Sequence, residues 1–187
     1  MSSYQEISSA IIGELSQTLG SVDSESARAF CDVLLSADEV FCAGAGRSGF
    51  QVKGFAMRLM HMGIRSYVVG ETCTPNIGPD GVLVIISGSG ETASLVNHAR
   101  KAKELGAKLL LVTIDPESTI AQLADAVVSI SAPSPKASVE ASITTIQPMG
   151  SLFEQSAGLF LDYIVVMAMK RQGMSSDEMF GRHANLE

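Results

Sequence analysis

The most constraining feature of this sequence is a run of five apolar residues, Val82 to Ile86, that ends in a loop of glycines and hydroxylated residues. A run that is apolar at every position, rather than at every second one, is typical of a strand covered on both faces, as in a parallel sheet between helices. Glycines let the backbone approach a ligand, and the free N–H groups of the next helix attract an anion. The pattern predicts a buried strand that leads into a phosphate-binding loop made of Ser87, Gly88, Ser89, Gly90, Glu91 and Thr92.

A second copy of this pattern lies earlier in the chain, where the apolar stretch Val40 to Ala43 runs into a glycine-rich loop at 44–49. Glycine and serine also form ordinary tight turns and helix caps, so either loop alone fits a purely structural role. Two hydroxyl-bearing loops in one sheet are harder to explain in that way. The earlier loop adds Gly46, Arg47 and Ser48 to the predicted phosphate-binding residues.

The earlier loop also matches the dinucleotide-binding fingerprint, as Gly44-x-Gly46-x-x-Gly49, with Glu71 near the position of a ribose-binding acid. Two observations weigh against this alternative. A dinucleotide domain needs one pyrophosphate turn, whereas the second loop of this chain repeats the pattern at 88–93. The serines also suit a compact phosphate monoester better than a pyrophosphate, which is held mainly by backbone groups.

The remaining apolar segments predict a sheet built around these two loops. Further strands are expected at Ile64 to Val69, Leu109 to Ile114 and Ala126 to Ile130, separated mostly by segments of helical periodicity. Such alternation indicates an α/β fold, a three-layer doubly wound five-stranded parallel sheet. We expect a single domain over 1–187 with N-terminal helices (1–37), an α/β core (38–172) and a C-terminal tail (173–187) near the active site.

Two segments after the last strand have distinct patterns. Residues 131–147 are rich in proline and serine, contain one basic residue, Lys136, and have no clear helical stripe. We interpret them as a long surface excursion that could serve as a lid. The next segment, from Ser151 to about Arg171, predicts a helix that is apolar around most of its circumference, so it must be covered on two sides.

Composition and charge narrow the classes of partner. The chain has a net charge of −7 and no block of Lys or Arg, so nucleic acids and acidic membranes are poor candidates. Its three cysteines, Cys31, Cys42 and Cys73, have no metal-type spacing and fit reduced thiols in the core. No signal peptide is visible, and the longest apolar stretch, 159–169, contains Asp162 and is shorter than a membrane span. We expect a soluble, cytoplasmic protein.

Few titratable residues are placed where they could react with a ligand bound beyond the strand ends. Glu154 follows Ser151 by three residues, which is also the capping-box pattern in which a Glu reaches back to the N-cap backbone. His61 and His98 fall inside predicted helices, where surface or packing roles are the simpler interpretation. The residue pattern alone assigns no role to His183.

Six segments together resemble the 6-phospho-3-hexuloisomerases, which are members of the sugar isomerase (SIS) domain family. The resemblance extends over nearly the whole chain and rests on Gly44–Gly49, Phe55–His61, Val69–Thr72, Ser87–Thr92, Pro148–Glu154 and Arg182–Leu186. It implies a flavodoxin-like sheet, phosphosugar binding at the serine loops, a homotetramer, and no metal or redox cofactor. It also implies that Glu154 is the proton acceptor, with His183 as a further catalytic residue.

The implied reaction converts 3-hexulose 6-phosphate to fructose 6-phosphate, in the ribulose monophosphate route of formaldehyde fixation. A carboxylate takes the proton from carbon 2, an enediol forms, and the proton returns to carbon 3. Because oxygen 6 is phosphorylated, a 3-ketose cannot close a five-membered ring through it, so His183 would move hydroxyl protons instead of opening a ring. The helix dipole keeps Glu154 ionised, which weakens it as a base, and apolar surroundings from Met149 and Phe153 would oppose that effect.

The expected element lengths separate His183 from Glu154 of the same chain. A helix over 152–171 is ~30 Å long, whereas the tail 173–183, with a short helix at 176–181, spans at most ~26 Å. The tail therefore falls just short of the way back, although a straight tail or a bent helix would close the gap. We predict that His183 acts in the site of a neighbouring subunit.

A second class of function stays open, namely a non-catalytic SIS module that senses a sugar phosphate. Such modules usually accompany a DNA-binding or transferase domain, and we expect no room for one in this chain. Formation of fructose 6-phosphate from 3-hexulose 6-phosphate separates an enzyme from a sensor.

Overall fold

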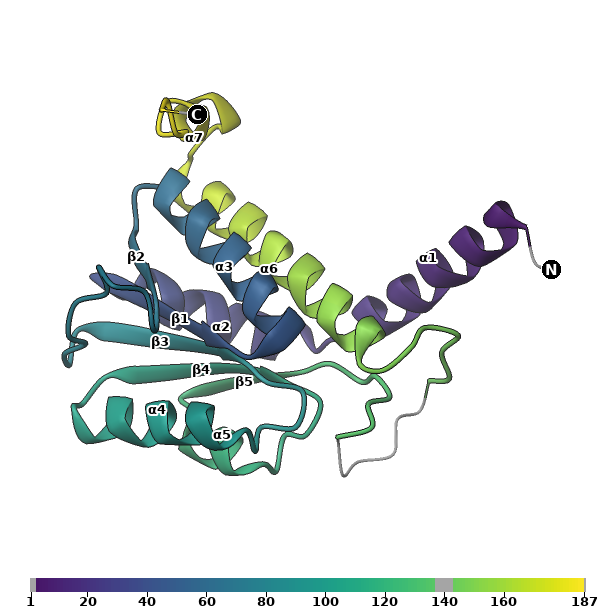
Figure 1. Ribbon diagram of the computed structural model, residues 1–187. Coiled ribbons are helices and arrows are strands. Elements are labelled where there is room, and N and C mark those ends of the chain that lie inside the picture. Colours follow the sequence, from purple (N-terminus) through teal and green to yellow (C-terminus); the bar gives the residue numbers. More distant parts are fainter. Residues whose placement is uncertain (1–2, 137–142, 187) are drawn as a thin grey trace.

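The computed structural model describes residues 3–136 and 143–186, which form a three-layer α/β fold (Figure 1). The middle layer is a parallel sheet in the order β2-β1-β3-β4-β5, made of β1 (Glu39–Gly44), β2 (Arg65–Val68), β3 (Gly81–Ile86), β4 (Lys108–Thr113) and β5 (Ala126–Ser129). This is the strand order of flavodoxin-like sheets. All strands are parallel, but β2 lies on one side of β1 and the later strands lie on the other, so the order of addition reverses between β1 and β3. The predicted fold is confirmed, and each predicted strand end lies within one residue of the observed one.

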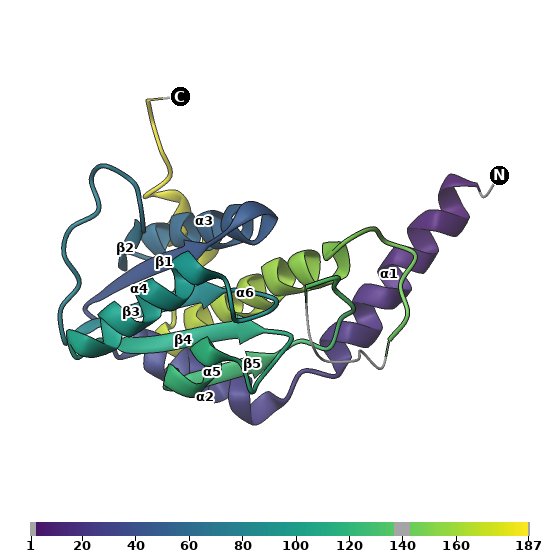
Figure 2. The ribbon, with the colours of Figure 1, turned by 60° about the horizontal axis from the view of Figure 1, so that its bottom comes forward.

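Helices cover both faces of the sheet (Figures 1 and 2). One face packs against α2 (Ser24–Leu35), α3 (Gly46–His61) and α6 (Ser151–Gln172), and the other against α4 (Ala93–Glu104) and α5 (Thr119–Leu123). Successive side chains of one strand point to opposite faces. Each buried strand therefore contributes to both cores, which explains why the sequence of β3 is apolar at every position.

The apolar helix α6 lies in the first core and is covered on two sides, as expected. Its side chains pack with α3, and Phe160 meets Phe30 of α2 edge-on at 5.6 Å between ring centroids. By length and hydropathy this helix could cross a membrane, which is also true of core helices, and half of its most apolar window is buried inside the protein. Leu159, Tyr163 and Val166 remain exposed on its outer side.

The N-terminal helix α1 (Tyr4–Gly20) extends away from the body of the protein (Figures 1 and 2). A capping box between Ser3 and Glu6 closes its first turn. Near its C-terminal end Leu15 packs against the first core, whereas Tyr4 and Ile12 are 80% and 63% exposed. The predicted amphipathic helix is therefore present, but the protomer covers its apolar side only toward the C-terminal end.

The three cysteines have two different environments. Cys31 and Cys42 are buried, and burial raises the pKa of the Cys42 thiol to about 12, so it is an inert core residue. The prediction of a core position is wrong for Cys73, which is exposed. This residue lies in the connection between β2 and β3, and connections run over the surface because their backbone groups need water or other partners.

The excursion after β5 is partly anchored rather than free. Ile143 and Gln147 are buried, and Thr145, Ile146 and Gln147 all donate hydrogen bonds to Glu14 of α1. This end of the segment is therefore attached to α1. The proposed lid also includes residues 137–142, which lie outside the described residues.

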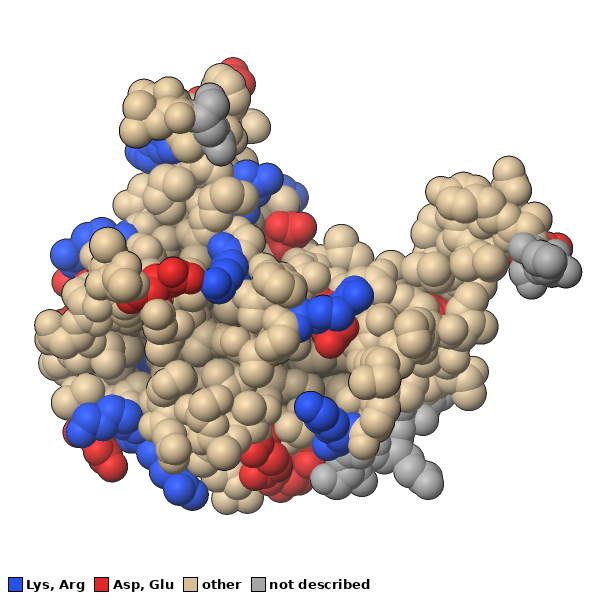
Figure 3. Space-filling view, viewed as in Figure 1, with Lys and Arg blue, Asp and Glu red and all other residues tan. Residues whose placement is uncertain are grey.

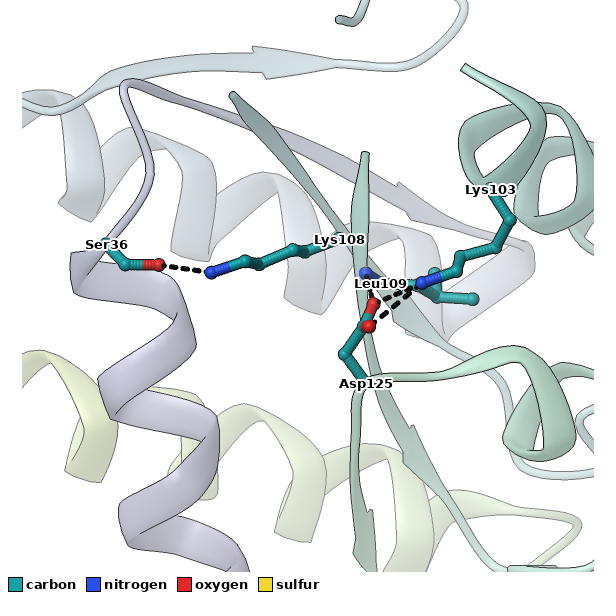
Figure 4. A network of polar contacts seen from close by, with 5 residues as sticks. All are labelled: Ser36, Lys103, Lys108, Leu109 and Asp125. Carbon is teal, nitrogen blue, oxygen red and sulfur yellow. Dashed lines mark hydrogen bonds and ion pairs between the residues drawn. The ribbon is translucent and has the colours of Figure 1, made fainter. Parts of the chain in front are cut away.

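A polar network holds the edge of the sheet opposite the carboxyl ends (Figure 4). Asp125, just before β5, accepts hydrogen bonds from the Leu109 backbone N–H at 2.7 Å and from Lys103 Nζ at 2.7 and 2.9 Å. Lys108 Nζ donates to Ser36 Oγ at 3.1 Å. The network connects α4, β4, β5 and α2 at the end of the sheet where the strands begin. The loops at the carboxyl ends of the strands, at the opposite end of the sheet, take no part in it.

A close contact between two glycines allows α3 to start directly after β1. A Cβ atom added at Gly49 would lie 2.8 Å from the carbonyl oxygen of Gly44. We predict that Gly49→Ala lowers the free energy of unfolding by ~1–3 kcal/mol through overpacking. Gly54→Ala on the same helix is the control, because nothing lies within 4 Å of its added Cβ. There the higher helix propensity of Ala should stabilise by ~0.5–1 kcal/mol. Urea unfolding measures both, and a stabilising Gly49→Ala would contradict the steric account.

Candidate active site

A pocket of about 210 Å³ lies at the carboxyl ends of β1 and β3, where the strand order reverses. This is the position at which open α/β sheets bind their ligands. Eight of the predicted site residues line the pocket and come from three elements; they are Gly46, Arg47, Ser48, Ser87, Gly88, Ser89, Thr92 and Glu154. The two serine loops therefore face one site, and the first turn of α6 borders it.

Three helices begin at this pocket without a side-chain cap. The N-cap residues are Ala45 for α3, Thr92 for α4 and Gly150 for α6, and none accepts a capping hydrogen bond in its side chain. The helices α1, α2 and α7 (Ser176–Phe180) lie elsewhere, and each is capped by a Ser or Asp side chain. Helix α5 also has no cap from its N-cap residue Ser118, but there the Glu91 carboxylate accepts a hydrogen bond from the Thr119 N–H. Uncapped first turns leave N–H groups and the positive end of the helix dipole open to a ligand. Three of them around one pocket form a site for an anion.

The hydroxyls of the second loop are oriented by the loop itself. Ser87 Oγ accepts a hydrogen bond from the Gly90 N–H at 3.1 Å, and Ser89 Oγ accepts from the Glu91 N–H at 3.2 Å. Each serine oxygen thus accepts a hydrogen bond from a backbone N–H of its own loop. Since neither hydroxyl donates to an acceptor within the described part of the chain, both O–H groups remain available as donors to a phosphate oxygen.

Glu154 does not cap its helix. The N-cap of α6 is Gly150, which has no side chain, and Ser151 is already the first helical residue, so the capping box predicted as the structural alternative does not form. The carboxylate instead points toward the pocket, where its Oε2 lies 2.7 Å from Arg47 Nε. The Arg47 N–H is not aimed at this buried oxygen, which makes no hydrogen bond. This oxygen is therefore paired with the charge of Arg47 but has no aligned hydrogen-bond donor in the described part of the chain.

The surroundings of Glu154 are apolar on one side only. Phe153 is 2% exposed, and its ring packs over Gly88, where an added Cβ would lie 3.3 Å from the ring. The expected contribution of Met149 is absent, because its side chain is 72% exposed. Met149 instead has a φ of 59°, a left-handed conformation that turns the chain into α6.

Two predicted binding residues belong to the loop but not to the pocket lining. A Cβ added at Gly90 would lie 1.9 Å from Ser118 Oγ, so this glycine is needed for close packing toward α5. Glu91 Oε1 accepts a hydrogen bond from the Thr119 N–H at 2.6 Å, and thereby satisfies the start of α5. The ribose-binding acid of the dinucleotide alternative is also elsewhere, since Glu71 pairs with Lys53 at 2.7 Å outside the pocket.

His183 lies at the opposite end of α3 from the pocket of its own chain. Its ring stacks on His61 with 5.3 Å between centroids, and Arg182 Nη1 donates to the His61 carbonyl at 3.2 Å. Burial, together with the nearby Arg58 and His183, lowers the pKa of His61. Arg47 and His61 are separated by ~21 Å along the helix, because each residue adds 1.5 Å. The structure therefore does not bring His183 together with Glu154 of the same chain.

Other pocket residues were not predicted as ligands. Ser134 and Lys136 follow β5 and line the pocket across from the serine loops. Lys136 is the one basic residue of its segment, which was a usable signal, whereas Ser134 resembles any other loop serine. Their position depends on the path by which the chain returns from β5 to α6.

Comparisons with known proteins agree with this geometry. The family model of the SIS domain matches residues 33–158. The chain is 46% identical to the 3-hexulose-6-phosphate isomerase of Bacillus subtilis (strain 168) over 177 residues, 95% of each chain. It is 37% identical to that of Mycobacterium gastri over 179 residues, 96% of this chain and 89% of the other.

A solved structure provides a third comparison. It is the crystal structure of a hypothetical protein of Methanococcus jannaschii, for which a molecular function of 3-hexulose-6-phosphate isomerase was inferred. The two structures match with a TM-score of 0.81 and 34% identity over 98% of each chain. By its fold, its loops and these similarities, the chain belongs to the SIS domain family.

Proposed function

We propose that this protein is an isomerase that interconverts 3-hexulose 6-phosphate and fructose 6-phosphate. The observation that supports this most directly is the pocket, in which three uncapped helix starts and the half-buried carboxylate of Glu154 face the same space. The first feature suits the phosphate, and the second suits a proton transfer on the attached sugar. The proposal agrees with the similarity to the 3-hexulose-6-phosphate isomerases of Bacillus subtilis and Mycobacterium gastri.

In this mechanism the phosphate binds to the hydroxyls and open N–H groups of the two loops, with Ser48, Ser87, Ser89 and Thr92 as side-chain donors. Glu154 removes the proton from carbon 2 of the open-chain ketose while the ketone oxygen on carbon 3 gains a proton. The enediol that results is the same from either sugar. Glu154 then returns the proton to carbon 3, and the hydroxyl on carbon 2 loses its proton to become the new ketone.

Arg47 suits two roles in this reaction. Its guanidinium has five N–H donors, and the Nε atom lies 2.7 Å from Glu154 Oε2. The side chain is 57% exposed and lines the pocket, so its other N–H groups are within the region of the bound anion. It would therefore balance the charge of the Glu154 carboxylate and also that of the phosphate.

We further propose a homotetramer in which His183 serves the site of a neighbouring subunit. Exposed apolar side chains gather on the outer surfaces of α3 and α6, namely Phe50, Met57, Met60, Leu159, Tyr163 and Val166. On the face shown in Figure 3, charged residues form small separate groups within a broad uncharged surface. Such a surface favours association with other copies. His183 and the pocket lie at opposite ends of α3, so a second subunit could place its tail at this pocket.

A sensor remains the second candidate function. A sensor would bind fructose 6-phosphate in the same pocket without converting it. For the enzyme, we propose a cytoplasmic location and a place in the ribulose monophosphate route of formaldehyde fixation. Turnover measured by a coupled assay for fructose 6-phosphate supports the enzyme, and binding without turnover supports the sensor.

The phosphate site is tested by Ser87→Ala and Ser89→Ala. Each change removes a hydrogen bond to a charged group, worth ~1.5–3 kcal/mol, so the KM for the sugar phosphate should rise by roughly tenfold or more. Ser129→Ala is the matched control, because Ser129 also lies at a strand end and bonds to the Ile114 carbonyl without lining the pocket. An unchanged KM in both test variants would remove the serine loops from phosphate binding.

The base is tested by Glu154→Gln, which keeps the size and removes the proton acceptor. Because Glu154 makes no cap, the variant should fold normally, and kcat should fall by ~10²–10⁴. Glu71→Gln is the control, since it breaks another ion pair with α3 outside the pocket and should leave kcat unchanged. Near-normal turnover of Glu154→Gln would return this residue to a structural role.

The location of His183 is tested by complementation. Glu154→Gln and His183→Ala should each be inactive alone. Co-expression makes mixed oligomers, and if His183 acts across an interface, some sites in the mixture contain both intact residues and activity returns. If His183 acts within its own chain, no such site exists and the mixture stays inactive.

A further inference from the structure

The carboxylate of Glu14, on α1, accepts three hydrogen bonds from three consecutive residues that are far away in the sequence. Thr145 Oγ1 donates to Oε2 at 2.7 Å, the Ile146 N–H donates to Oε1 at 2.8 Å, and Gln147 Nε2 donates to Oε2 at 2.9 Å. Burial alone would raise the pKa of Glu14, but the hydrogen bonds from Gln147, Thr145 and Ile146 together lower it. The carboxylate is therefore ionised at neutral pH and holds this segment in one conformation.

The same segment leads directly to the candidate base. Gln147 Oε1 accepts a hydrogen bond from Gln155 Nε2 at 2.5 Å, and Gln155 is the neighbour of Glu154 on α6. Only the short turn 148–150 separates Gln147 from the first residue of α6. In that turn Met149 has a left-handed backbone, which costs energy in a residue other than glycine and persists only when surrounding contacts impose it.

Core stability does not explain these contacts well. Within the described residues α1 buries a single residue, Thr18, and its N-terminal half extends away from the body (Figure 1). Glu14 also has no ion pair in the described part of the chain, so its charge is balanced by the three donors alone. An ionised group that holds a loop next to a reactive residue is better explained by a role in fixing the position of that residue.

We infer that Glu14 is a positioning residue, which fixes the start of α6 and thereby the carboxylate of Glu154 relative to the phosphate site. This inference rests on the proposed role of Glu154. The side-chain donors assigned to the phosphate, Ser48, Ser87, Ser89 and Thr92, lie in the loops after β1 and β3, and the hydrogen bonds of Glu14 in the described part of the chain go to 145–147 and not to these loops. Of the phosphate site, only the N–H groups at the start of α6 depend on Glu14, so loss of Glu14 should lower kcat far more than phosphate affinity.

The test variant is Glu14→Gln, in which an NH₂ group replaces one acceptor oxygen and faces the donors of the segment. We expect kcat to fall by roughly 10- to 100-fold, because a displacement near 1 Å can have that effect. The inhibition constant of inorganic phosphate should change far less than kcat, because the serine loops that supply the side-chain donors are not held by Glu14. In hydrogen–deuterium exchange, peptides over 143–155 should exchange faster, and peptides over 87–92 should not.

Two further variants make the test specific. Glu25→Gln removes a carboxylate from an exposed ion pair with Arg28 on α2 and should change neither kcat nor exchange. Gln155→Met removes the link between the segment and α6 while keeping the side-chain size. It should lower kcat to a similar extent, and the double variant with Glu14→Gln should be no worse than either single one, because both changes interrupt one network.

An unchanged kcat in Glu14→Gln would overturn the inference, and so would a loss of phosphate affinity together with faster exchange throughout the protein. If the wild-type protein does not isomerise the sugar phosphate, the proposed function fails on its own account. The exchange measurement still reports on Glu14 in that case. Faster exchange confined to 143–155 supports its control over the start of α6, and unchanged exchange there overturns it.

Discussion

The site depends on one electrostatic constraint, the presence of three helix N-termini without side-chain caps around a single pocket. The open N–H groups at the starts of α3, α4 and α6 are all stabilised by a negative charge in the pocket. Glu154 supplies part of it from inside the protein, and its partner Arg47 limits the excess of negative charge. A dianionic phosphate would supply the rest, in agreement with the proposed sugar-phosphate ligand.

The helices α3 and α6 connect the pocket with the C-terminal tail (Figure 1). They pack side by side, and the beginning of each lies at the pocket, with Arg47 on one and Glu154 on the other. Their opposite ends hold the C-terminal tail, where His183 stacks on His61. The proposed reaction therefore divides a proton acceptor and a histidine between two ends of one layer. An oligomer that brings unlike ends together would complete the site.

Much of the site was predictable because its chemistry is local. The serine loops are visible as short patterns after apolar runs, and the hydroxyl-rich loop with an apolar strand before it requires only neighbouring residues. Prediction was weaker where one pattern fits two roles. Glu154 matches a capping box, yet Gly150 takes the N-cap position, and Glu91 matches a ligand, yet its carboxylate satisfies Thr119 of α5. For Glu154, a shift of the helix start by one residue removes the capping role. For Glu91, a hydrogen bond to another partner takes the carboxylate away from the pocket.

The sequence by itself determined the parallel sheet and the two candidate anion-binding loops, because apolar runs, glycines and helix starts act through near neighbours. Only the tertiary structure decided which groups meet across long separations. It placed Arg47 against Glu154, moved His183 to the far end of α3, and joined Glu14 to the segment before α6. Such contacts depend on the path of the connections and on the packing of whole helices, and these quantities leave no periodic trace in the residues themselves.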